Sequence, residues 1–286
     1  MTTIDYEAIA REAGLERVGA RASFGAYFKQ MWERRGFAIS LAKYRVQASM
    51  SDNRLGLAWI VLSPLLNAAL YGTIFGVIMP RDTRGDEPFI PFLIIGVFIF
   101  QFFSKSFSAG AKSITGNASL VRSLNFPRML LPIAEIIRQV IELIPMIIVM
   151  MIIVMVLGVP PAWSWFMIIP IMVCMTMFNL GVALISARLT VHIRDMTQII
   201  PLITRVMFYT TGIFYSLEAV LADQPALLTI AQLNPVHDYV ALVRDAVFNS
   251  GSAPAWMWWI AGLGGFITLV VGILFFWRAE ERYGHD

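Results

Sequence analysis

The sequence is poor in two things that soluble enzymes rely on, cysteine and charge. Its 286 residues include one cysteine, Cys174, and three histidines, His192, His237 and His285. One cysteine excludes a disulfide framework within the chain and a thiolate metal site, and the histidines lack the spacing of a metal-ligand motif. Charged residues make up 14% of the chain, where a soluble domain carries about a quarter.

Several nucleotide-binding and catalytic motifs are also missing from the sequence. It contains no GxxxxGK[ST] loop, no HExxH and no GxSxG, so nucleotide hydrolysis, zinc-dependent hydrolysis and serine hydrolysis of the usual kinds are not expected. The dipeptide His237-Asp238 is the one acid–base pair to consider, and alone it is a weak signal. We therefore expect no catalytic residue, no metal and no cofactor in this chain, and no nucleic-acid partner.

What the sequence has in abundance is apolar residues, 58% of the total. They are arranged in blocks of the roughly 20 residues that one transmembrane helix needs. The proline- and tryptophan-containing stretch Gly158–Trp165 divides the longest run in two. The sequence predicts an all-α polytopic membrane protein, with residues 57–277 forming a domain of six transmembrane helices. The expected spans are Leu57–Met79, Phe89–Ala111, Met129–Leu157, Ser164–Ala187, Met196–Leu217 and Pro254–Trp277.

The positive charges give the chain an orientation. Lys and Arg concentrate in the N-terminal region 1–56, in 112–128, in 188–205 and in the tail 278–286. Only Arg81, Arg84 and Arg244 fall on the other side of the predicted membrane domain. Because basic loops stay in the cytoplasm, we expect a protein of the cytoplasmic membrane with both termini inside.

Residues 24–50, just before the first span, form an amphipathic pattern. Apolar side chains follow one helical face from Phe24 to Trp32, and basic residues occupy the rest. A basic helix with aromatic residues is typical of one lying flat at the membrane interface; packing on a small cytosolic domain is the alternative. The residues expected at lipid headgroups are Trp32, Arg34, Arg35, Lys43, Tyr44 and Arg45.

Two polar loops differ in character. Ser113–Pro132 is basic and free of acidic residues, so we expect it on the cytoplasmic side. There a soluble partner could bind the membrane domain. Residues 218–253 form the largest outer loop, in which we expect short helices that return toward the membrane, separated by a break at Asn234-Pro235.

Three ionisable residues stand within the third span. Glu135, Arg138 and Glu142 share one helical face at spacings of three and four. Because charges at membrane depth are costly unless paired, Arg138 is expected to bridge one or both glutamates. The cluster either lines the mouth of a polar path or an intersubunit contact, or lies at the level of the headgroups.

The second span is rich in phenylalanine. These rings either pack against neighbouring helices and lipid, or line a path for a sugar chain by stacking on the apolar face of sugar rings. The candidate channel residues are Phe98, Phe100, Phe102, Phe103 and Phe107.

Four motifs together resemble the permease subunit of ABC-2 type polysaccharide exporters over about residues 24–277. The first is Tyr44-Arg45 followed by Gly56, Trp59 and Pro64, although the stretch between Arg45 and Gly56 departs from the family pattern. The second is the loop containing Asn117 to Pro132, and the third is Arg194-Asp195. The fourth is the outer pair Asn234-Pro235 and Arg244-Asp245.

The resemblance implies an exporter built from two copies of this chain and two copies of a separate ABC ATPase, which would bind ATP and Mg. Residues 113–128 would be the coupling loop, with Asn117, Leu120, Val121, Arg122, Phe126, Pro127 and Arg128 set against the ATPase. The cargo would be a polyprenyl-pyrophosphate glycan such as galactan, O-antigen or teichoic acid, with its pyrophosphate near Arg34, Arg35, Lys43 or Arg45. The alternatives are an ABC-2 drug or lipid efflux permease and a membrane-embedded enzyme acting on a polyprenyl-linked sugar.

Overall fold

The computed structural model describes residues 23–51, 58–78, 87–193 and 195–280, and within these ranges every regular element is a helix. The predicted all-α class is therefore confirmed. Residues 1–22, 52–57, 79–86, 194 and 281–286 lie outside the described ranges, and with them Gly56 and Arg194 of the family motifs, the span ends Leu57 and Met79, and Arg81 and Arg84. The longer helices are α3 (Arg35–Ser51), α4 (Ala58–Ile78), α5 (Phe89–Ala111), α7 (Leu130–Val156), α8 (Ile168–His192), α9 (Met196–Thr210), α12 (Pro235–Phe248) and α14 (Gly265–Trp277). The shorter ones are α2 (Phe24–Glu33), η2 (Thr115–Asn117), α6 (Ala118–Ser123), η3 (Trp163–Met167), α10 (Leu217–Val220), α11 (Pro225–Gln232), α13 (Ala255–Trp259) and η4 (Ile260–Gly264).

Four helical segments in the described part of the chain are long and apolar enough to cross a membrane. They are Phe89–Ala111, Leu130–Val156, Trp163–His192 and Ala255–Trp277, which coincide with the second, third, fourth and sixth expected spans. Helix α4 contains the apolar helical segment Val61–Phe75.

The helix in the region of the expected fifth span, Met196–Leu217, is shorter than the prediction. Helix α9 ends at Thr210, so its 15 residues cover about 22 Å. The helix ends because Gly212 adopts a left-handed conformation with φ of +73°, which begins the turn toward α10.

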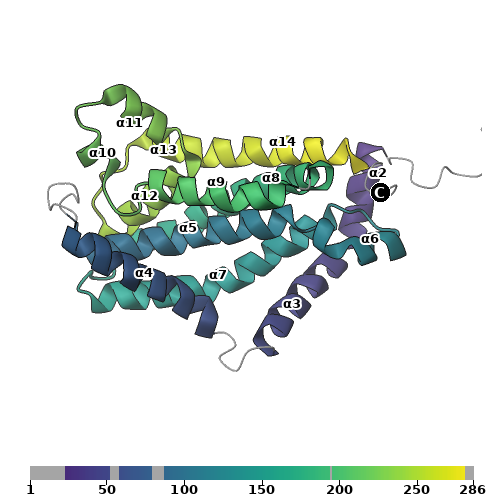
Figure 1. Cartoon of the computed structure of the whole chain (residues 1–286), viewed down its shortest axis with the longest axis horizontal. Coiled ribbons are helices and arrows are strands. Elements are labelled where there is room, and N and C mark those ends of the chain that lie inside the picture. Colours follow the sequence, from purple (N-terminus) through teal and green to yellow (C-terminus); the bar gives the residue numbers. More distant parts are fainter. Residues whose placement is uncertain (1–22, 52–57, 79–86, 194, 281–286) are drawn as a thin grey trace, which may run out of the picture.

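Helix α5 is the centre of the bundle. It packs against α4, α7, α8, α9 and α12, and Figure 1 shows it running the length of the molecule among them. Helices α8 and α14 approach closely through glycine: a Cβ at Gly181 would lie 2.3 Å from the Thr268 carbonyl oxygen. Small residues at such a contact let two backbones touch, as in membrane helix pairs.

The N-terminal amphipathic segment is two helices rather than one. Helix α2 ends at Glu33 and α3 begins at Arg35, and the two point in different directions in Figure 1. Gly36, a poor helix former, follows the break, and the Arg34 guanidinium donates to the Asn125 carbonyl oxygen. This contact with a distant loop holds the break in place.

The molecule has two distinct ends. Helices α2 and α6 and the end of α14 lie together at one end, and α10, α11 and α13 lie at the other (Figure 1). The Tyr27 hydroxyl donates to Glu280 over 2.9 Å, so both ends of the described chain meet. At the far end, the predicted break holds: α11 ends at Gln232, and the Asn234 side chain caps α12 by accepting from the Val236 N–H at 3.1 Å.

Candidate functional site

A network of opposite charges connects α3, α5 and α7. Arg138 Nε donates to Glu142 Oε1 over 2.9 Å, and an Arg138 Nη1 to Glu135 Oε2 distance of 3.9 Å confirms that Arg138 bridges both glutamates. Lys105 of α5 lies 4.0 Å from Glu142. Helical periodicity puts all three α7 residues on one face, and that face turns toward α3 and α5.

Arg45, expected from the sequence to lie at lipid headgroups, joins this network. Arg45 forms an ion pair with Glu135 and donates to Asn117 Oδ1 over 2.6 Å. Asn117 in turn donates to the Ser113 carbonyl oxygen over 2.5 Å. Burial lowers the pKa of Arg45, and the Arg138 charge adds to that effect. One side chain therefore ties the helix before the membrane domain to a loop and to α7.

The loop expected to couple to a partner folds into η2 and α6. Asn117 and Val121 face inward, with Val121 buried, whereas Arg122 and Leu124 are exposed, Leu124 by 51%. Helix α6, which contains Arg122, lies at the same end of the molecule as α2 (Figure 1).

The later part of the loop is engaged by the chain itself. The Phe126 ring packs against Phe37 of α3 at 5.0 Å between centroids, and Pro127 is buried. Arg128 donates through its backbone N–H to Glu280 Oε1 over 2.9 Å and through Nη1 to the Glu280 carbonyl oxygen over 2.7 Å. Burial raises the pKa of Glu280, and the hydrogen bonds from Arg128 and Tyr27 oppose that rise.

The six residues expected at lipid headgroups divide into two groups. Arg45 forms an ion pair with Glu135 and donates to Asn117, and Arg34, although exposed, donates through Nη1 to the Asn125 carbonyl oxygen. The other four are on the outer surface: Trp32 is 70% and Tyr44 68% exposed, Arg35 stacks over Trp32 at 4.8 Å, and Lys43 is exposed.

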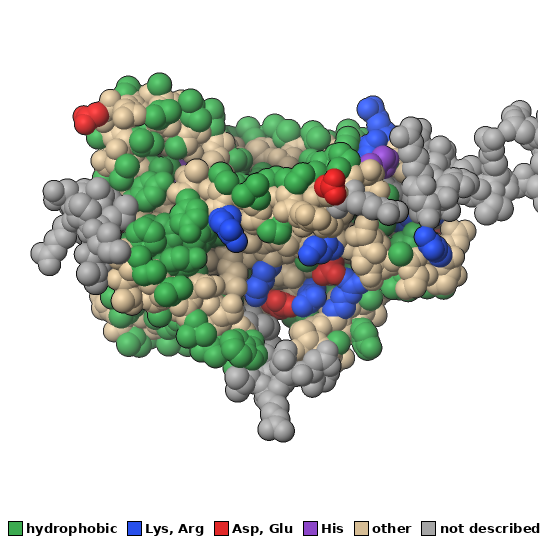
Figure 2. Space-filling view, in the orientation of Figure 1, with side chains coloured by type: hydrophobic (Ala, Val, Ile, Leu, Met, Phe, Trp, Pro, Cys, Tyr) green, Lys and Arg blue, Asp and Glu red, His purple; other side chains and the backbone are tan. Residues whose placement is uncertain are grey.

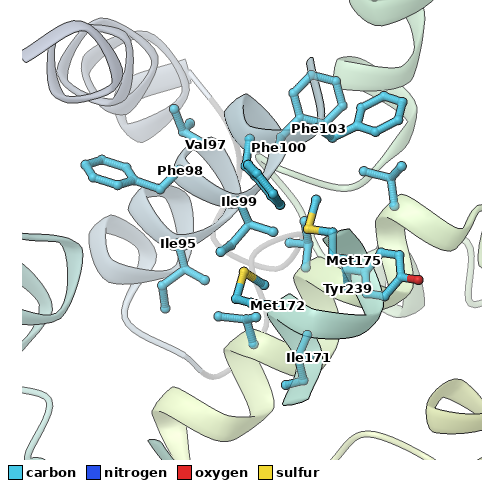
Figure 3. Packing of buried hydrophobic residues seen from close by; sticks show 14 of the residues in the cluster. Ile95, Val97, Phe98, Ile99, Phe100, Phe103, Ile171, Met172, Met175 and Tyr239 are labelled. Atoms are coloured by element: carbon cyan, nitrogen blue, oxygen red, sulfur yellow. The ribbon is translucent and has the colours of Figure 1, made fainter. Parts of the chain in front are cut away.

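The five phenylalanines proposed for a channel lie in the core of the bundle. All are 9% exposed or less, and Figure 3 shows Ile99 and Phe103 of α5 among Met172 and Met175 of α8 and Tyr239 of α12. Of the two alternatives, Phe98, Phe102, Phe103 and Phe107 fit the first, because their rings pack against neighbouring helices. Phe100 differs, because it also borders an open pocket together with Phe208.

The other end of the molecule is closed by Arg244. Its guanidinium is buried, lies 3.3 Å from the Phe92 ring centroid, and donates to the carbonyl oxygens of Phe92, Gly212 and Ile213 at 2.9 to 3.2 Å. Asp245, its neighbour, accepts from Ser252 and Ala253 backbone N–H groups at 2.7 and 3.3 Å. Arg244 and Asp245 thus bind the turns at 212–213 and 252–253 to α12.

A cavity of about 550 Å³ beside Arg244 contains Glu87, Glu218 and His237 among its lining residues. The His237 imidazole and the Asp238 carboxyl form no hydrogen bond with each other, so they do not act as an acid–base pair in this structure. His237 Nδ1–H donates to the Thr211 carbonyl oxygen over 2.9 Å, and the fully buried Asp238 carboxyl has no hydrogen-bond partner in the described residues. Burial raises the pKa of Asp238 to about 7. Across the described ranges, no three His, Cys, Asp or Glu side chains are placed to hold a metal ion.

Comparison with known proteins agrees with this arrangement of apolar helices and polar ends. Residues 38–248 match a protein family described as ABC-2 type transporter. The chain is 29% identical over 243 residues to an O-antigen export system permease protein of Klebsiella pneumoniae, covering 84% of this chain and 89% of that protein. It is 26% identical over 208 residues to a protein of the same description from Myxococcus xanthus, covering 73% of this chain and 78% of that protein.

Proposed function

Because the chain belongs to the ABC-2 type transporter family, we propose that it is the membrane permease subunit of an exporter that carries a lipid-linked polysaccharide across the cytoplasmic membrane. The observation that carries this proposal is the similarity, along most of the chain, to permeases described as O-antigen exporters in two organisms. The substrate would be a glycan on a polyprenyl pyrophosphate, of which galactan, O-antigen and teichoic acid are the candidate kinds.

In this proposal, a separate ABC ATPase binds ATP and Mg and supplies the energy. The chain itself has no phosphate-binding GxxxxGK[ST] loop, so hydrolysis must come from another subunit. The docking surface would be α6 and the loop after it, where Arg122 and Leu124 are exposed. The same end of the molecule carries α2 and the end of α14, which supports placing both termini in the cytoplasm (Figure 1).

The Arg45 contacts offer a route by which motion at the ATPase reaches the membrane. A shift of the loop would pull on Asn117, and Arg45 would pass that shift to Glu135 of α7 and to α3. Packed elements with discrete contacts transmit such displacements rather than absorbing them.

Two copies of the chain would enclose the path for the glycan. In the proposal, helices α4 and α9 are the first and fifth of six membrane crossings. Helix α9 is short for a crossing, so the turn at Gly212 would complete it or the bilayer would be thinner there.

The decisive experiment is depletion of this protein in its native cell. Lipid-linked glycan should accumulate on the cytoplasmic side while surface glycan declines, and re-expression should reverse both. Normal surface glycan without an accumulated intermediate contradicts export. An ABC-2 permease for drugs or small lipids would instead change drug sensitivity or lipid composition and leave the glycan untouched, and an enzyme would change the structure of the lipid-linked sugar rather than its location.

A further inference from the structure

An open pocket of about 350 Å³ lies between α4, α5 and α9. It adjoins the salt-bridged network described above, and Lys105 belongs to both. Figure 2 shows Lys and Arg side chains, with a few acidic ones, gathered on this face of the molecule beside apolar surface. The polar residues that matter here are Lys105, Gln101 and Ser104 of α5, Arg205 and Thr204 of α9, and Asn67 of α4.

The charge of this pocket is positive and is not neutralised from its own lining. Lys105 and Arg205 both border it, and no Asp or Glu does. The carboxylate nearest to Lys105 is Glu142 at 4.0 Å, which Arg138 already holds at 2.9 Å. Arg205 is exposed and forms no ion pair with a carboxylate among the described residues.

Two cations on transmembrane or membrane-depth helices need water or an anion beside them, because lipid solvates them at great cost. The rest of the lining favours an anion with many oxygens. Amide and hydroxyl groups from Gln101, Asn67 and Ser104 surround the cations, and phosphate oxygens accept from ammonium, guanidinium, amide and hydroxyl donors together.

The surroundings of the pocket favour a lipid as the carrier of that phosphate. Exposed apolar side chains flank it on both helices: Leu66 and Leu70 of α4 are 53% and 55% exposed, and Leu202 and Val206 of α9 are 60% and 54% exposed. A prenyl chain can lie along such a surface while its headgroup reaches inward. The aromatic rings of Tyr71 and Phe208, 5.2 Å apart, border the same pocket and offer a face to a sugar.

We propose that this pocket binds the pyrophosphate of the polyprenyl-linked glycan, with Lys105 and Arg205 as the two cations that hold it. The inference rests on the proposed export function, which supplies a substrate carrying a pyrophosphate between lipid and sugar. It differs from the expectation that the pyrophosphate lies near Arg34, Arg35, Lys43 or Arg45. Of these four, Arg45 is engaged by Glu135 and Asn117, and the other three are exposed at the break between α2 and α3 and on α3 and do not line this pocket.

The test is binding of radiolabelled undecaprenyl pyrophosphate to the complex of permease and ATPase in nanodiscs. Lys105→Gln and Arg205→Gln should each weaken binding about tenfold, since a charge-assisted contact of this kind changes affinity by about that factor. The double variant should weaken binding by about 30-fold or more, and the affinity of the wild-type complex should fall as salt rises. Lys112→Gln, which changes an exposed lysine one residue beyond α5, is the matched control and should stay within twofold of wild type.

Arg205→Lys keeps the charge and should retain most of the affinity, which separates loss of a ligand contact from loss of fold; unchanged thermal unfolding of the double variant supports the same conclusion. Binding by the double variant within threefold of wild type overturns the proposal. Competition by undecaprenol as strong as by the pyrophosphate also overturns it, because the pocket would then recognise the chain alone. Equal competition by inorganic pyrophosphate overturns the lipid source and leaves a site for free phosphate.

The binding assay does not require export, so the two proposals fail separately. A double variant that binds normally, in a protein whose depletion traps lipid-linked glycan, removes only the pocket. A wild-type complex that binds pyrophosphate lipid, in cells whose depletion leaves surface glycan normal, removes only the export of glycan.

Discussion

Gly96 of α5 leaves the space that the Arg244 guanidinium of α12 fills. A Cβ at Gly96 would lie 2.5 Å from Arg244 Nη2 and 3.2 Å from the Ile213 Cγ2 atom. Through its hydrogen bonds to the carbonyl oxygens of Phe92 and Gly212, Arg244 holds the start of α5 and the turn after α9 together. The absence of one side chain on α5 thus permits a buried arginine that no span could hold alone.

Gly96→Ala should destabilise the protein for this reason. Overpacking of this kind costs about 1–3 kcal/mol, which exceeds the gain of up to about 1 kcal/mol that alanine brings to a helix. The measurement is the thermal unfolding midpoint of the purified protein in detergent, which should fall by several degrees. Gly36→Ala is the control, because a Cβ there meets nothing within 4 Å and should leave the midpoint unchanged or raise it. A Gly96→Ala protein as stable as wild type would show that Arg244 has room to move.

The ion pair between Arg45 and Glu135 should be energetically coupled. Arg45→Gln leaves Glu135 with only the longer contact to Arg138, and Glu135→Gln leaves Arg45 without a carboxylate, at a cost of up to about 3 kcal/mol each. The double variant should lose less than the sum of the two, with a coupling energy of about 1–3 kcal/mol. Thermal unfolding of the four proteins measures this, and Lys43→Gln, an exposed lysine of the same helix, should have no effect. Strictly additive losses would mean that the pair contributes nothing to stability.

The buried Asp238 carboxyl should make stability depend on pH. Its pKa is raised to about 7 in the folded protein, whereas an exposed Asp titrates near about 4. The folded state therefore binds this proton more tightly than the unfolded state, and stability should fall as pH rises from about 4 through about 7. Asp238→Asn, which cannot ionise, should unfold at a higher temperature than wild type at pH 8 and should lose that advantage near pH 5. Parallel pH profiles of the two proteins would contradict the assignment.

Substitutions in the loop after α6 should affect ATPase binding and protein stability separately. Leu124 is 51% exposed on the proposed ATPase side, so Leu124→Asp should reduce co-purification of the ATPase and stimulated ATP hydrolysis about tenfold while unfolding stays normal. Phe126→Ala together with Arg128→Ala should instead lower the unfolding midpoint, because the Phe126 ring packs against Phe37 and the Arg128 guanidinium donates to the Glu280 carbonyl oxygen. ATPase binding that is insensitive to Leu124→Asp would place the docking surface elsewhere.

The sequence determined the features that depend on short stretches of chain. Within the described residues, four helices long and apolar enough to cross a membrane follow from apolarity summed over about 20 residues, and the Arg138 bridge follows from helical spacing within α7. The break at Asn234-Pro235 follows from proline chemistry at a helix start. Local pattern was less reliable where distant contacts intervene: the amphipathic stretch broke at Arg34, and α9 ended at Thr210.

Only the tertiary structure decided which distant residues meet. Arg45 reaches Asn117 and Glu135, Arg128 reaches Glu280, and Arg244 fits above Gly96. Nothing in local spacing fixes such pairs, because they depend on how whole helices pack. The same packing turned the phenylalanines of α5 inward and brought Lys105 and Arg205 to one pocket. A hydrophobic pattern specifies that a helix is buried, but the neighbours that bury it are chosen by the fold.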